Sequence, residues 1–467
     1  MPRIYLGKIP LHWCDRCHVP VLAGRCGCGA EARPVPVTPP GDARPAFEDD
    51  IAHINRVYRD HFGSPLLPDG HIVLLNKVPS EDRMDEIILG GAVVGAVRYL
   101  PGEDRWEPLP RPCACMLMKP QKRYVIADDG AIPSISEGAS LLAPGLVRID
   151  PSVAAGDEVF IMDRSGGCIG VGRARVDAAA AAQMERGVVV RTRKNLPSDC
   201  VPAPAGWDLA VEANAAVLAA YEEASVQFVR EVAAEHPLPL TVSYSGGKDS
   251  LATLLVVLKA VGNVPLIFAD TGLEFPETYE NVREVAECYG LDVVRIREEG
   301  AFFEALEREG PPAVDLRWCC RVCKLHPVSR LIEREWGECL SFIGQRKYES
   351  VRRWQSSKVW RNAQVKNQVS AAPIQQWTAM HVWLYLFRER APYNRLYRRR
   401  LDRIGCFMCP SSDIATLRMI EAEYPELWRM WREHLEAWRE KEGLPAEWVS
   451  AAGWRRRGGR DEADSYN

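Results

Sequence analysis

A strand–turn–helix segment at residues 238–261 limits the fold of this chain more than any other feature. An apolar, β-branched run ends at Ser245, and a long aliphatic helix is expected after Ser250. Between them lies a turn of small and polar residues: Gly246, Gly247, Lys248, Asp249 and Ser250. In such a turn the glycines let backbone N–H groups face an anion, the helix dipole favours negative charge, and the lysine adds a mobile cation. The segment predicts a phosphate site; the alternative is a glycine turn that only joins a strand to a helix.

The turn lacks the G-x-x-x-x-G-K-[ST] spacing of a Walker loop. Its six residues, Ser245 to Ser250, instead resemble the PP-loop motif S-G-G-x-D-S of the ATP pyrophosphatases. Those enzymes split ATP between the α and β phosphates and leave AMP on a substrate. The resemblance implies that ATP and Mg²⁺ bind at this loop, that all six residues contact the nucleotide, and that Lys248 and Asp249 are catalytic.

Composition places further limits on the chain. The length of 467 residues is enough for about three domains, and the net charge of −4 restricts nucleic-acid binding to local basic patches. The sequence contains no bilayer-length apolar run and no recognisable signal peptide, so we expect a cytoplasmic protein without a membrane segment. Most of the 15 cysteines stand in tight pairs, which in this context indicates metal binding more than disulfides.

Residues 1–45 are expected to form a zinc ribbon followed by a linker. Four cysteines have the spacing C-x2-C-x8-C-x-C: Cys14, Cys17, Cys26 and Cys28. Four thiolates suit one tetrahedral Zn²⁺, and a segment too short for its own apolar core would take its folding energy from the metal. Disulfides or unused thiols are the alternative. The Pro-rich stretch at 33–45 is expected to be the linker.

Residues 46–120 mix helical and strand patterns and are expected to form an α+β region. Cys113 and Cys115 are interpreted as two thiols on one face of a strand rather than as a metal site.

Residues 121–200 show the glycine turns and alternating apolar positions of a small β-barrel. Their motifs resemble the PUA domain of RNA-modifying enzymes: Glu137-Gly138, Ala143-Pro144-Gly145-Leu146, Gly156-Asp157-Glu158-Val159 and Gly170-Val171-Gly172-Arg173-Ala174. The resemblance implies that the face with Gly138 and Gly145 meets an RNA backbone. Arg173 and Arg175 would add positive charge for phosphates, or would simply form the solvated face of an ordinary barrel.

From about residue 209 the chain alternates helices and strands, with strands expected at 238–245, 264–271, 291–297 and 339–345. This order predicts an α/β domain with a parallel sheet covered on both faces. Ligands bind at the carboxyl ends of such strands, where Ser245 and Asp270 lie.

Ordered motifs within residues 209–435 resemble the phosphoadenosine phosphosulfate (PAPS) reductase family. They are the D-T-G-x-x-F-P-E-T-Y run from Asp270, Trp318-Cys319-Cys320 with Lys324, Gly344-Gln345-Arg346 with Glu349-Ser350, Pro392-Tyr393-Asn394, and Cys406-x2-Cys409-Pro410. The resemblance implies a PP-loop, HUP-like fold in which Asp270, Thr271 and Arg346 contact the nucleotide. Arg346, Arg353 and Lys324 are candidate phosphate clamps, with surface ion pairing as the alternative.

The same resemblance implies an iron–sulfur site. Cys319, Cys320, Cys406 and Cys409 match the four positions that hold a [4Fe–4S] cluster in some members. Cys323 stands where the family usually has arginine, so five thiols compete for four positions. Cys323 is therefore a substitute ligand and a candidate catalytic thiol. The two C-x2-C pairs would also suit a structural Zn²⁺.

Two departures separate this chain from the sulfonucleotide reductases. Those enzymes need a nucleophilic cysteine near the C-terminus, whereas no cysteine follows Cys409, and residues 436–467 are expected to form a tail. Reductases that use PAPS also usually lack the loop lysine, which is present here as Lys248. Both departures indicate ATP chemistry rather than sulfate reduction.

The function favoured by these patterns is ATP-dependent thiolation of tRNA through an adenylated base. The expected partners are tRNA, ATP and a sulfide donor or sulfur carrier, and a homodimer is compatible with the sequence. Three alternatives stay open: a PAPS or adenosine phosphosulfate reductase, sulfur transfer to a DNA backbone or small metabolite, and an RNA-binding protein with a non-catalytic ATP site.

Overall fold

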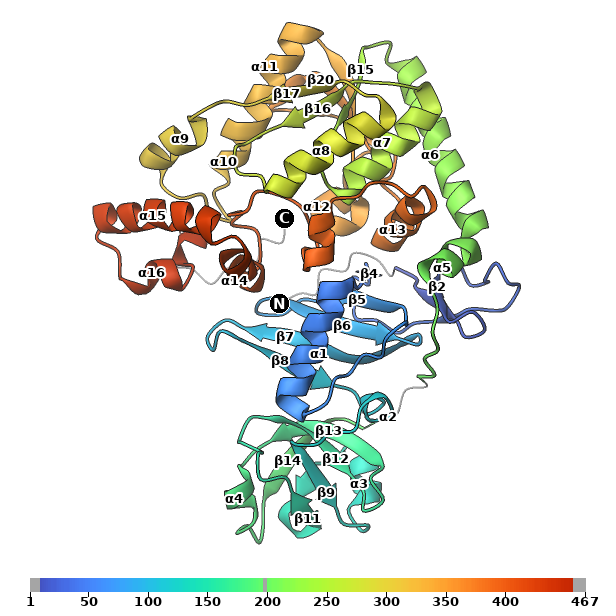
Figure 1. Ribbon diagram of the computed structural model, residues 1–467, viewed down its shortest axis with the longest axis vertical. Coiled ribbons are helices and arrows are strands. Elements are labelled where there is room, and N and C mark those ends of the chain that lie inside the picture. The colour runs from blue at the N-terminus through green and yellow to red at the C-terminus, as the bar shows by residue number, and fades with distance from the viewer. Residues whose placement is uncertain (1–8, 196–199, 457–467) are drawn as a thin grey trace. The chain divides into compact units, whose positions relative to one another are not determined.

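The computed structural model describes residues 9–195 and 200–456, which fall into two compact units. The N-terminal unit comprises the described residues up to 214, and the C-terminal unit comprises those from 215 (Figure 1). Three pieces of the expected ribbon, barrel and tail lie outside the described residues: 1–8, 196–199 and 457–467. Within the described part, no helix combines the length and the apolar character needed to cross a bilayer.

The ribbon is a small antiparallel sheet tied to a distant helix. Its strands pair in the order β2-β1-β3, with bounds β1 (His12–Cys14), β2 (Val19–Val21) and β3 (Arg33–Pro34). Asn214 follows α5 (Trp207–Ala213), accepts a hydrogen bond from Leu22 N at 2.7 Å and donates one to Pro20 O at 2.9 Å. The ribbon is therefore stabilised by a helix that comes almost two hundred residues later, in addition to any metal.

The expected linker at 33–45 is folded at both ends, which corrects its assignment. Its first residues form β3, and its last form β4 (Arg44–Pro45), where Arg44 Nη1 makes a buried ion pair with Asp50 Oδ2 at 2.7 Å. Both strands are short and lie at sheet edges, where a proline without an N–H donor is tolerated. Proline content alone therefore predicted a linker where the chain forms two short strands.

Residues 46–120 form a helix against an antiparallel sheet of order β4-β5-β6-β7-β8. The helix α1 (Glu48–Phe62) packs on β8. The other strands are β5 (Val73–Lys77), β6 (Met84–Leu89), β7 (Ala92–Leu100) and β8 (Arg105–Pro110). Cys113 is not on a strand, contrary to the prediction. After β8 the chain turns at Pro112 and enters the short helix α2 (Ala114–Leu117), because prolines interrupt the strand ladder.

The expected barrel is a six-stranded sheet of order β10-β14-β13-β12-β9-β11, in which β9 and β12 run parallel. Its strands are β9 (Tyr124–Ala127), β10 (Leu141–Leu142), β11 (Leu146–Ile149), β12 (Glu158–Met162), β13 (Cys168–Ala174) and β14 (Val188–Lys194). Short helices α3 (Ile132–Ser136) and α4 (Ala178–Ala181) accompany them. Phe160 of β12 packs edge-on against Phe62 of α1, with ring centroids 4.8 Å apart. The α+β region and the barrel thus share apolar core.

The C-terminal unit contains a six-stranded sheet of order β17-β16-β15-β18-β20-β19, parallel except for the edge strand β19. Its strands are β15 (Leu240–Ser243), β16 (Leu266–Ala269), β17 (Val293–Ile296), β18 (Cys339–Ile343), β19 (Val359–Asn362) and β20 (Val365–Ala371). The first four fall inside the ranges predicted from sequence. The last two were not predicted, because their mixed polar sequence lacks a clear alternating pattern.

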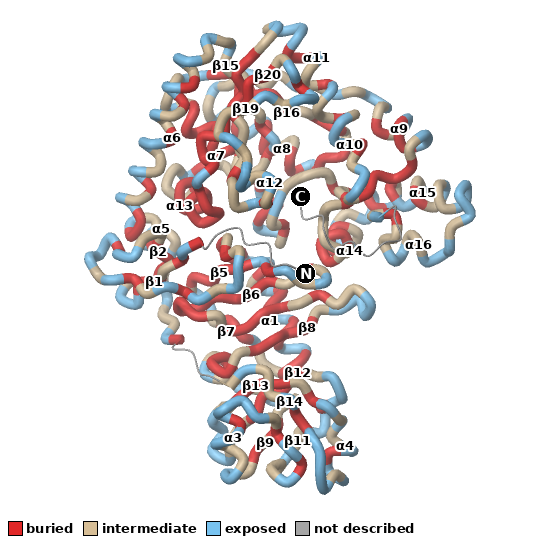
Figure 2. The backbone as a smooth tube through the Cα atoms, turned by 180° about the vertical axis from the view of Figure 1, so that it is seen from behind, coloured by how far each residue is buried: buried red, intermediate tan, exposed pale blue. Residues whose placement is uncertain are grey.

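Helices cover both faces of this sheet. The right-handed crossovers from β15 to β16 and from β16 to β17 place α7 and α8 on one face, and the return to β18 places α11 on the other. Helices α6 and α13 pack on α7, and the side chains of α13 are almost all buried (Figure 2). The bounds are α6 (Ala215–Glu235), α7 (Lys248–Val261), α8 (Pro276–Tyr289), α9 (Ala301–Glu309), α11 (His326–Glu335) and α13 (Ala379–Arg388).

The C-terminal segment is a folded helical cap, so the expected boundary at 435/436 is wrong. That boundary falls within α15 (Pro425–Glu442), which follows α14 (Ile414–Glu423) and precedes α16 (Glu447–Ser450). Trp431 and Trp454 are buried against each other, with ring centroids 5.3 Å apart. Apolar burial of these aromatic side chains is what folds the segment.

Asn214→Ala should lower the stability of the N-terminal unit by about 2 kcal/mol, because buried hydrogen bonds to the ribbon and to Ala210 O would be lost. The change would be measured as a lower midpoint of thermal unfolding. Asn263→Ala, at an exposed position, is the matched control and should unfold like the parent. Equal midpoints for the two variants would contradict the role of Asn214.

Candidate nucleotide and thiol site

The PP loop lies at the point where the strand order of the sheet reverses. The chain runs outward from β15 through β16 to β17 and then returns to β18 on the other side of β15. Crevices at such switch points, beyond the carboxyl ends of the strands, are where open α/β sheets bind ligands. The two sides touch closely: a Cβ on Gly344, after β18, would lie 2.5 Å from Asp249 C and Ser250 N. The structure thus joins the two motifs that the sequence separates by almost a hundred residues.

A half-buried carboxylate between two cations is the main electrostatic feature of the loop. Asp249 Oδ2 accepts from Lys248 Nζ at 2.5 Å, and Asp249 Oδ1 accepts from Arg346 Nε at 2.6 Å. Burial alone would raise the pKa of Asp249, but the charges of Arg346 and Lys248 outweigh it and hold that pKa below its ordinary value. The group carries one excess positive charge at the N-terminus of α7, which suits a phosphate.

The backbone of the loop is held by residues from a distant segment. Tyr397, in the short helix η4 (Arg395–Arg399), is buried and accepts a hydrogen bond from Lys248 N at 2.9 Å. Gly246 has a φ of +73°, and a Cβ there would lie 2.9 Å from Thr278 Cγ2. Only glycine meets both conditions without strain. Asn394 Nδ2 donates to Thr278 Oγ1 at 3.3 Å and completes this support.

Asp270 is placed at the end of β16 as predicted, but its carboxylate is already occupied. It accepts from Tyr279 OH and Gly272 N on one oxygen, at 2.7 and 2.8 Å. The other oxygen accepts from Arg295 Nε at 2.8 Å. These donors hold the pKa of Asp270 below its ordinary value against the effect of burial. Asp270 therefore stabilises the turn after β16 and positions Arg295. Neighbouring groups, rather than Asp270, would contact a nucleotide directly.

A polar chain connects the strand end of β16 to the cysteines. Thr271 Oγ1 donates to Glu274 Oε2 at 2.8 Å and lies 3.5 Å from Cys406 Sγ. Lys324 Nζ lies 3.7 Å from Glu274 Oε1, and the charges of Cys406 and Glu274 raise its pKa despite burial. Lys324 was predicted as a phosphate clamp, but in the structure its charge interacts with the thiols. Arg353, the third predicted clamp, pairs with Glu349.

The five predicted thiols come from one helix and one loop. Cys319 and Cys320 lie in α10 (Trp318–Cys320), which continues into the π-helical turn η2 (Arg321–Leu325) that contains Cys323. A π-turn widens the helix and is common at functional sites. Phe407 N donates to Leu273 O at 2.9 Å, so the loop that carries Cys406 and Cys409 is held beside Thr271. At the other end of this loop, Arg455 Nε donates to Pro410 O at 3.0 Å.

The environments of these thiols differ. The hydrogen bond with Cys319 and the nearby charge of Lys324 lower the pKa of Cys320 to about 6, and burial raises the pKa of Cys406 to about 11. Cys323 is buried among apolar side chains, and burial raises its pKa to about 12. At neutral pH it is a protonated thiol of low reactivity unless a metal binds it.

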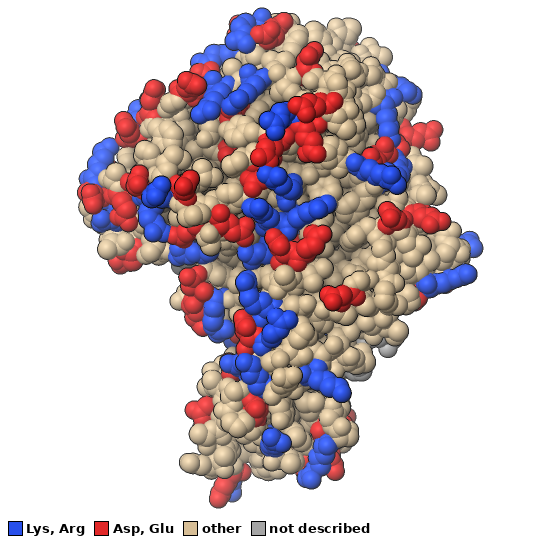
Figure 3. All heavy atoms as spheres, viewed as in Figure 1, with Lys and Arg blue, Asp and Glu red and all other residues tan. Residues whose placement is uncertain are grey.

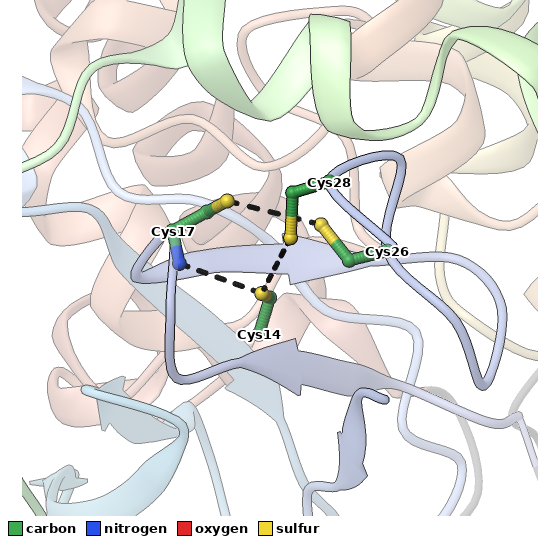
Figure 4. A group of neighbouring side chains, drawn as sticks. All are labelled: Cys14, Cys17, Cys26 and Cys28. Carbon is green, nitrogen blue, oxygen red and sulfur yellow. Dashed lines mark hydrogen bonds between the residues drawn. The ribbon is translucent and has the colours of Figure 1, made fainter. Parts of the chain in front are cut away.

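The ribbon cysteines fit a single metal ion. Their sulfur atoms point toward one another (Figure 4) and all lie within 4.8 Å, with Cys14 Sγ to Cys28 Sγ at 3.7 Å and Cys17 Sγ to Cys26 Sγ at 4.0 Å. Tetrahedral Zn²⁺ with Zn–S bonds of about 2.3 Å places its sulfurs about 3.8 Å apart. Burial raises the pKa of Cys26 to about 11, so a cation would be needed to hold all four as thiolates.

The residues of the barrel that were predicted to bind RNA differ in their exposure to solvent. Gly138 and Arg175 are exposed, and Gly138 has a φ of +100°. Gly145 lies where a Cβ would come within 2.9 Å of Ala131 Cβ. Arg173, in contrast, donates to the buried Glu107 at 2.7 Å, so its charge is used within the unit. Figure 3 shows basic and acidic side chains interspersed in that view, consistent with a chain of small net charge.

Comparison with known proteins identifies the class of two parts of the chain. Residues 239–412 match the phosphoadenosine phosphosulfate reductase domain, and residues 123–196 match the PUA domain. These matches confirm the predicted fold class, a parallel α/β domain together with a PUA barrel.

One relative extends along nearly the whole chain. The protein MJ0066 of Methanocaldococcus jannaschii, which is named uncharacterized, is 38% identical over 468 residues and aligns with 97% of each chain. The present chain belongs to the same family. It is also 28% identical to adenosine 5′-phosphosulfate reductase of Bacillus pumilus over 173 residues, which is 36% of this chain and 72% of that protein. The crystal structure of a PAPS reductase from Candida auris is similar at a TM-score of 0.34, with 23% identity over 42% of this chain and 94% of that one.

Sequence reasoning missed several residues of the site. Tyr397 and Arg295 contact the loop and Asp270 through the tertiary fold, and nothing in their local sequence indicates it. Glu274 lies inside the recognised run after Asp270, so its position in that run was the one available signal. Arg346 was predicted, but not its pairing with Asp249.

Purified protein should contain about one zinc ion per chain in the ribbon. Cys26→Ser should lose that zinc, since three thiolates bind it far less tightly than four, and elemental analysis would measure the loss. Cys288→Ser, at an exposed cysteine outside both thiol sets, is the control and should keep the metal. Zinc retained by Cys26→Ser would mean that the ribbon is not the zinc site.

Proposed function

We propose that this protein transfers sulfur to a base of tRNA in an ATP-dependent reaction. The observation that carries the proposal is a short path of polar side chains within the C-terminal unit. It runs from the strand ends of the sheet, the edge at which the PP loop lies, to the thiols. Thr271 follows the β16 strand end and reaches Cys406, and Glu274 connects Thr271 to Lys324. A nucleotide at the strand ends would therefore lie near the sulfur atoms.

The loop residues suit the activation step. The β and γ phosphates of ATP would draw Lys248 and Arg346 from Asp249, and the first amides of α7 would face the same anion. Asp249 would keep one cation in place or hold Mg²⁺, which neutralises the phosphates. A carbonyl oxygen of the base would then attack the α-phosphorus, and pyrophosphate would leave.

The second step exchanges oxygen for sulfur. Sulfide would attack the activated carbon of the base, the C–O bond would break, and AMP would leave with the original oxygen. Sulfur is not oxidised or reduced in this sequence, so no external reductant is required. Lys324 would stabilise anionic sulfur beside it, because its charge already faces Cys406 and Cys320.

We assign the second set of thiols to an iron–sulfur group rather than to a single metal ion. Among the described residues, the ribbon alone brings three or more metal-ligating groups within 4.8 Å of one another. Of the four predicted ligands, Cys319 and Cys320 share a hydrogen bond, and the charges of Cys406 and Cys409 also act on Cys319. Three of the four would hold a [4Fe–4S] cluster, which when bound would supply an iron without a cysteine ligand to carry the sulfur to be transferred.

The PUA domain supports an RNA acceptor over a small metabolite. The residues expected to meet RNA and left exposed are Gly138 and Arg175. A fold alone does not prove a ligand, so the acceptor is part of the proposal.

A second candidate function is sulfonucleotide reduction, because the catalytic domain is similar to adenosine 5′-phosphosulfate reductase. That reaction needs a thiolate that attacks sulfur and is freed by a second thiol. Cys323 is buried, and burial raises its pKa to about 12, so it is a poor nucleophile at neutral pH. This favours thiolation.

Lys248→Ala should reduce RNA-dependent pyrophosphate release from ATP by about a hundredfold or more, since it removes a cation that faces developing phosphate charge. Pyrophosphate would be measured with unmodified tRNA, sulfide and Mg²⁺ present. Lys259→Ala, at the other end of the same helix, is the control and should retain the parent rate. A parent-like rate for Lys248→Ala would remove the PP loop from the reaction.

Anaerobically purified protein should carry about four irons per chain, and Cys406→Ser should lose iron while keeping the ribbon zinc. The parent should form AMP and thiolated nucleoside together from ATP, sulfide and tRNA. It should release no sulfite from adenosine phosphosulfate or PAPS with thioredoxin. Two zincs and no iron would overturn the cluster assignment. Sulfite release that Cys323→Ala abolishes would establish the reductase instead.

A further inference from the structure

The segment at residues 345–358 presents aromatic rings and cations next to the PP loop. Trp354, in the short helix α12 (Val351–Trp354), has 40% of its surface exposed, whereas every other tryptophan in the described chain is buried or half-buried. A single exposed apolar side chain needs no explanation. Here, however, the exposed ring belongs to a group of interacting side chains.

Tyr348 and Trp354 pack edge to face, with ring centroids 5.6 Å apart. Lys347 Nζ lies 4.8 Å from the Tyr348 centroid and 4.7 Å from the Trp354 centroid, within the range of a cation–π contact to both. Lys347, Tyr348 and Trp354 are called the aromatic platform below. One cation thus fixes two rings, while part of the Trp354 surface stays open to solvent.

The platform is anchored at several points. Lys347 N donates to Gln375 O at 2.9 Å, and Trp354 N donates to Ser350 O at 2.9 Å. Gln345 Nε2 donates to Ser356 Oγ at 2.9 Å and so joins the two ends of the segment. A surface held in this way would lose little conformational entropy when it binds a ligand.

The platform is also linked directly to the catalytic loop. Arg346 immediately precedes it and pairs with Asp249, and Glu349 accepts from Arg346 N at 2.9 Å. Glu349 also pairs with Arg353 at the base of Trp354. In addition, the negative charge of Glu349 acts on Tyr397, the residue that holds Lys248 N. The segment that carries the rings thus also supplies Arg346 to the PP loop.

We infer that the aromatic platform stacks an unpaired base of the acceptor RNA and so presents a neighbouring nucleotide to the PP loop. This inference rests on the proposed function and assigns the acceptor contact within the C-terminal unit. Proteins read single-stranded RNA by stacking its bases on aromatic rings and by pairing its phosphates with cations. The segment supplies both, since it holds five basic residues and one acidic residue, and Arg352 is exposed. This net positive charge favours an RNA ligand over a peptide that contains few acidic residues.

Trp354→Ala in the full-length protein should weaken binding of a single-stranded oligoribonucleotide by about tenfold, because one base loses its stacking partner. Trp354→Phe should stay within about threefold of the parent, since the smaller ring still stacks. The matched control is Trp438→Ala, which removes a tryptophan with Lys441 Nζ 4.6 Å from its ring centroid, on α15. It should bind like the parent.

The salt dependence of the same binding separates stacking from charge. Arg352→Ala should reduce the slope of log affinity against log salt by about 1, whereas Trp354→Ala should leave that slope unchanged. The assay contains neither ATP nor sulfide, so its result does not depend on whether thiolation occurs. Trp354→Ala binding as tightly as the parent, or Trp438→Ala losing affinity equally, would overturn the platform. Loss in Trp354→Ala alone would support it even if no thiolated product formed.

Discussion

The pairing of Asp249 with Lys248 and Arg346 is the interaction on which the catalytic unit depends. All three side chains are largely withdrawn from water, and an unpaired buried charge would cost several kcal/mol. The pairing therefore draws together the end of β15, the start of α7 and the end of β18. Because two cations face one carboxylate, the group also has a surplus of positive charge that an anionic phosphate can satisfy. The charges that stabilise the fold here are thus the same ones that the proposed nucleotide would contact.

A second charge balance governs the thiols. Lys324 lies between Glu274 and the sulfur atoms, and its cation lowers the cost of a thiolate at Cys320 or Cys406. Cys323 differs because it faces the apolar core formed with the C-terminal helices. The thiolate form is therefore favoured at Cys320, whereas Cys323, three positions away, stays a protonated thiol in the core. Cys320 ends α10, whereas Cys323 lies inside the π-helical turn η2 that follows it.

In the N-terminal unit, burial decides which arginines remain available to a ligand. Arg173 and Arg193 pair with Glu107 and Glu158, two carboxylates that are almost completely buried. Removing either arginine would leave a buried charge uncompensated, so these residues stabilise the junction of the barrel and the α+β region. Arg175 stays exposed and retains its charge for a ligand.

The sequence by itself determined the local chemistry: the PP loop from Ser245 to Ser250, the four ribbon thiols, the first four strands of the parallel sheet and the glycine turns of the barrel. These depend on backbone geometry and ligand spacing over a few residues, which local order records. Only the tertiary structure decided which distant residue each polar or charged group contacts. Asp249 meets Arg346, Asp270 meets Arg295, Lys248 N meets Tyr397, and the ribbon meets Asn214. Such contacts join residues far apart in the chain and follow from strand order and burial, which no local pattern encodes.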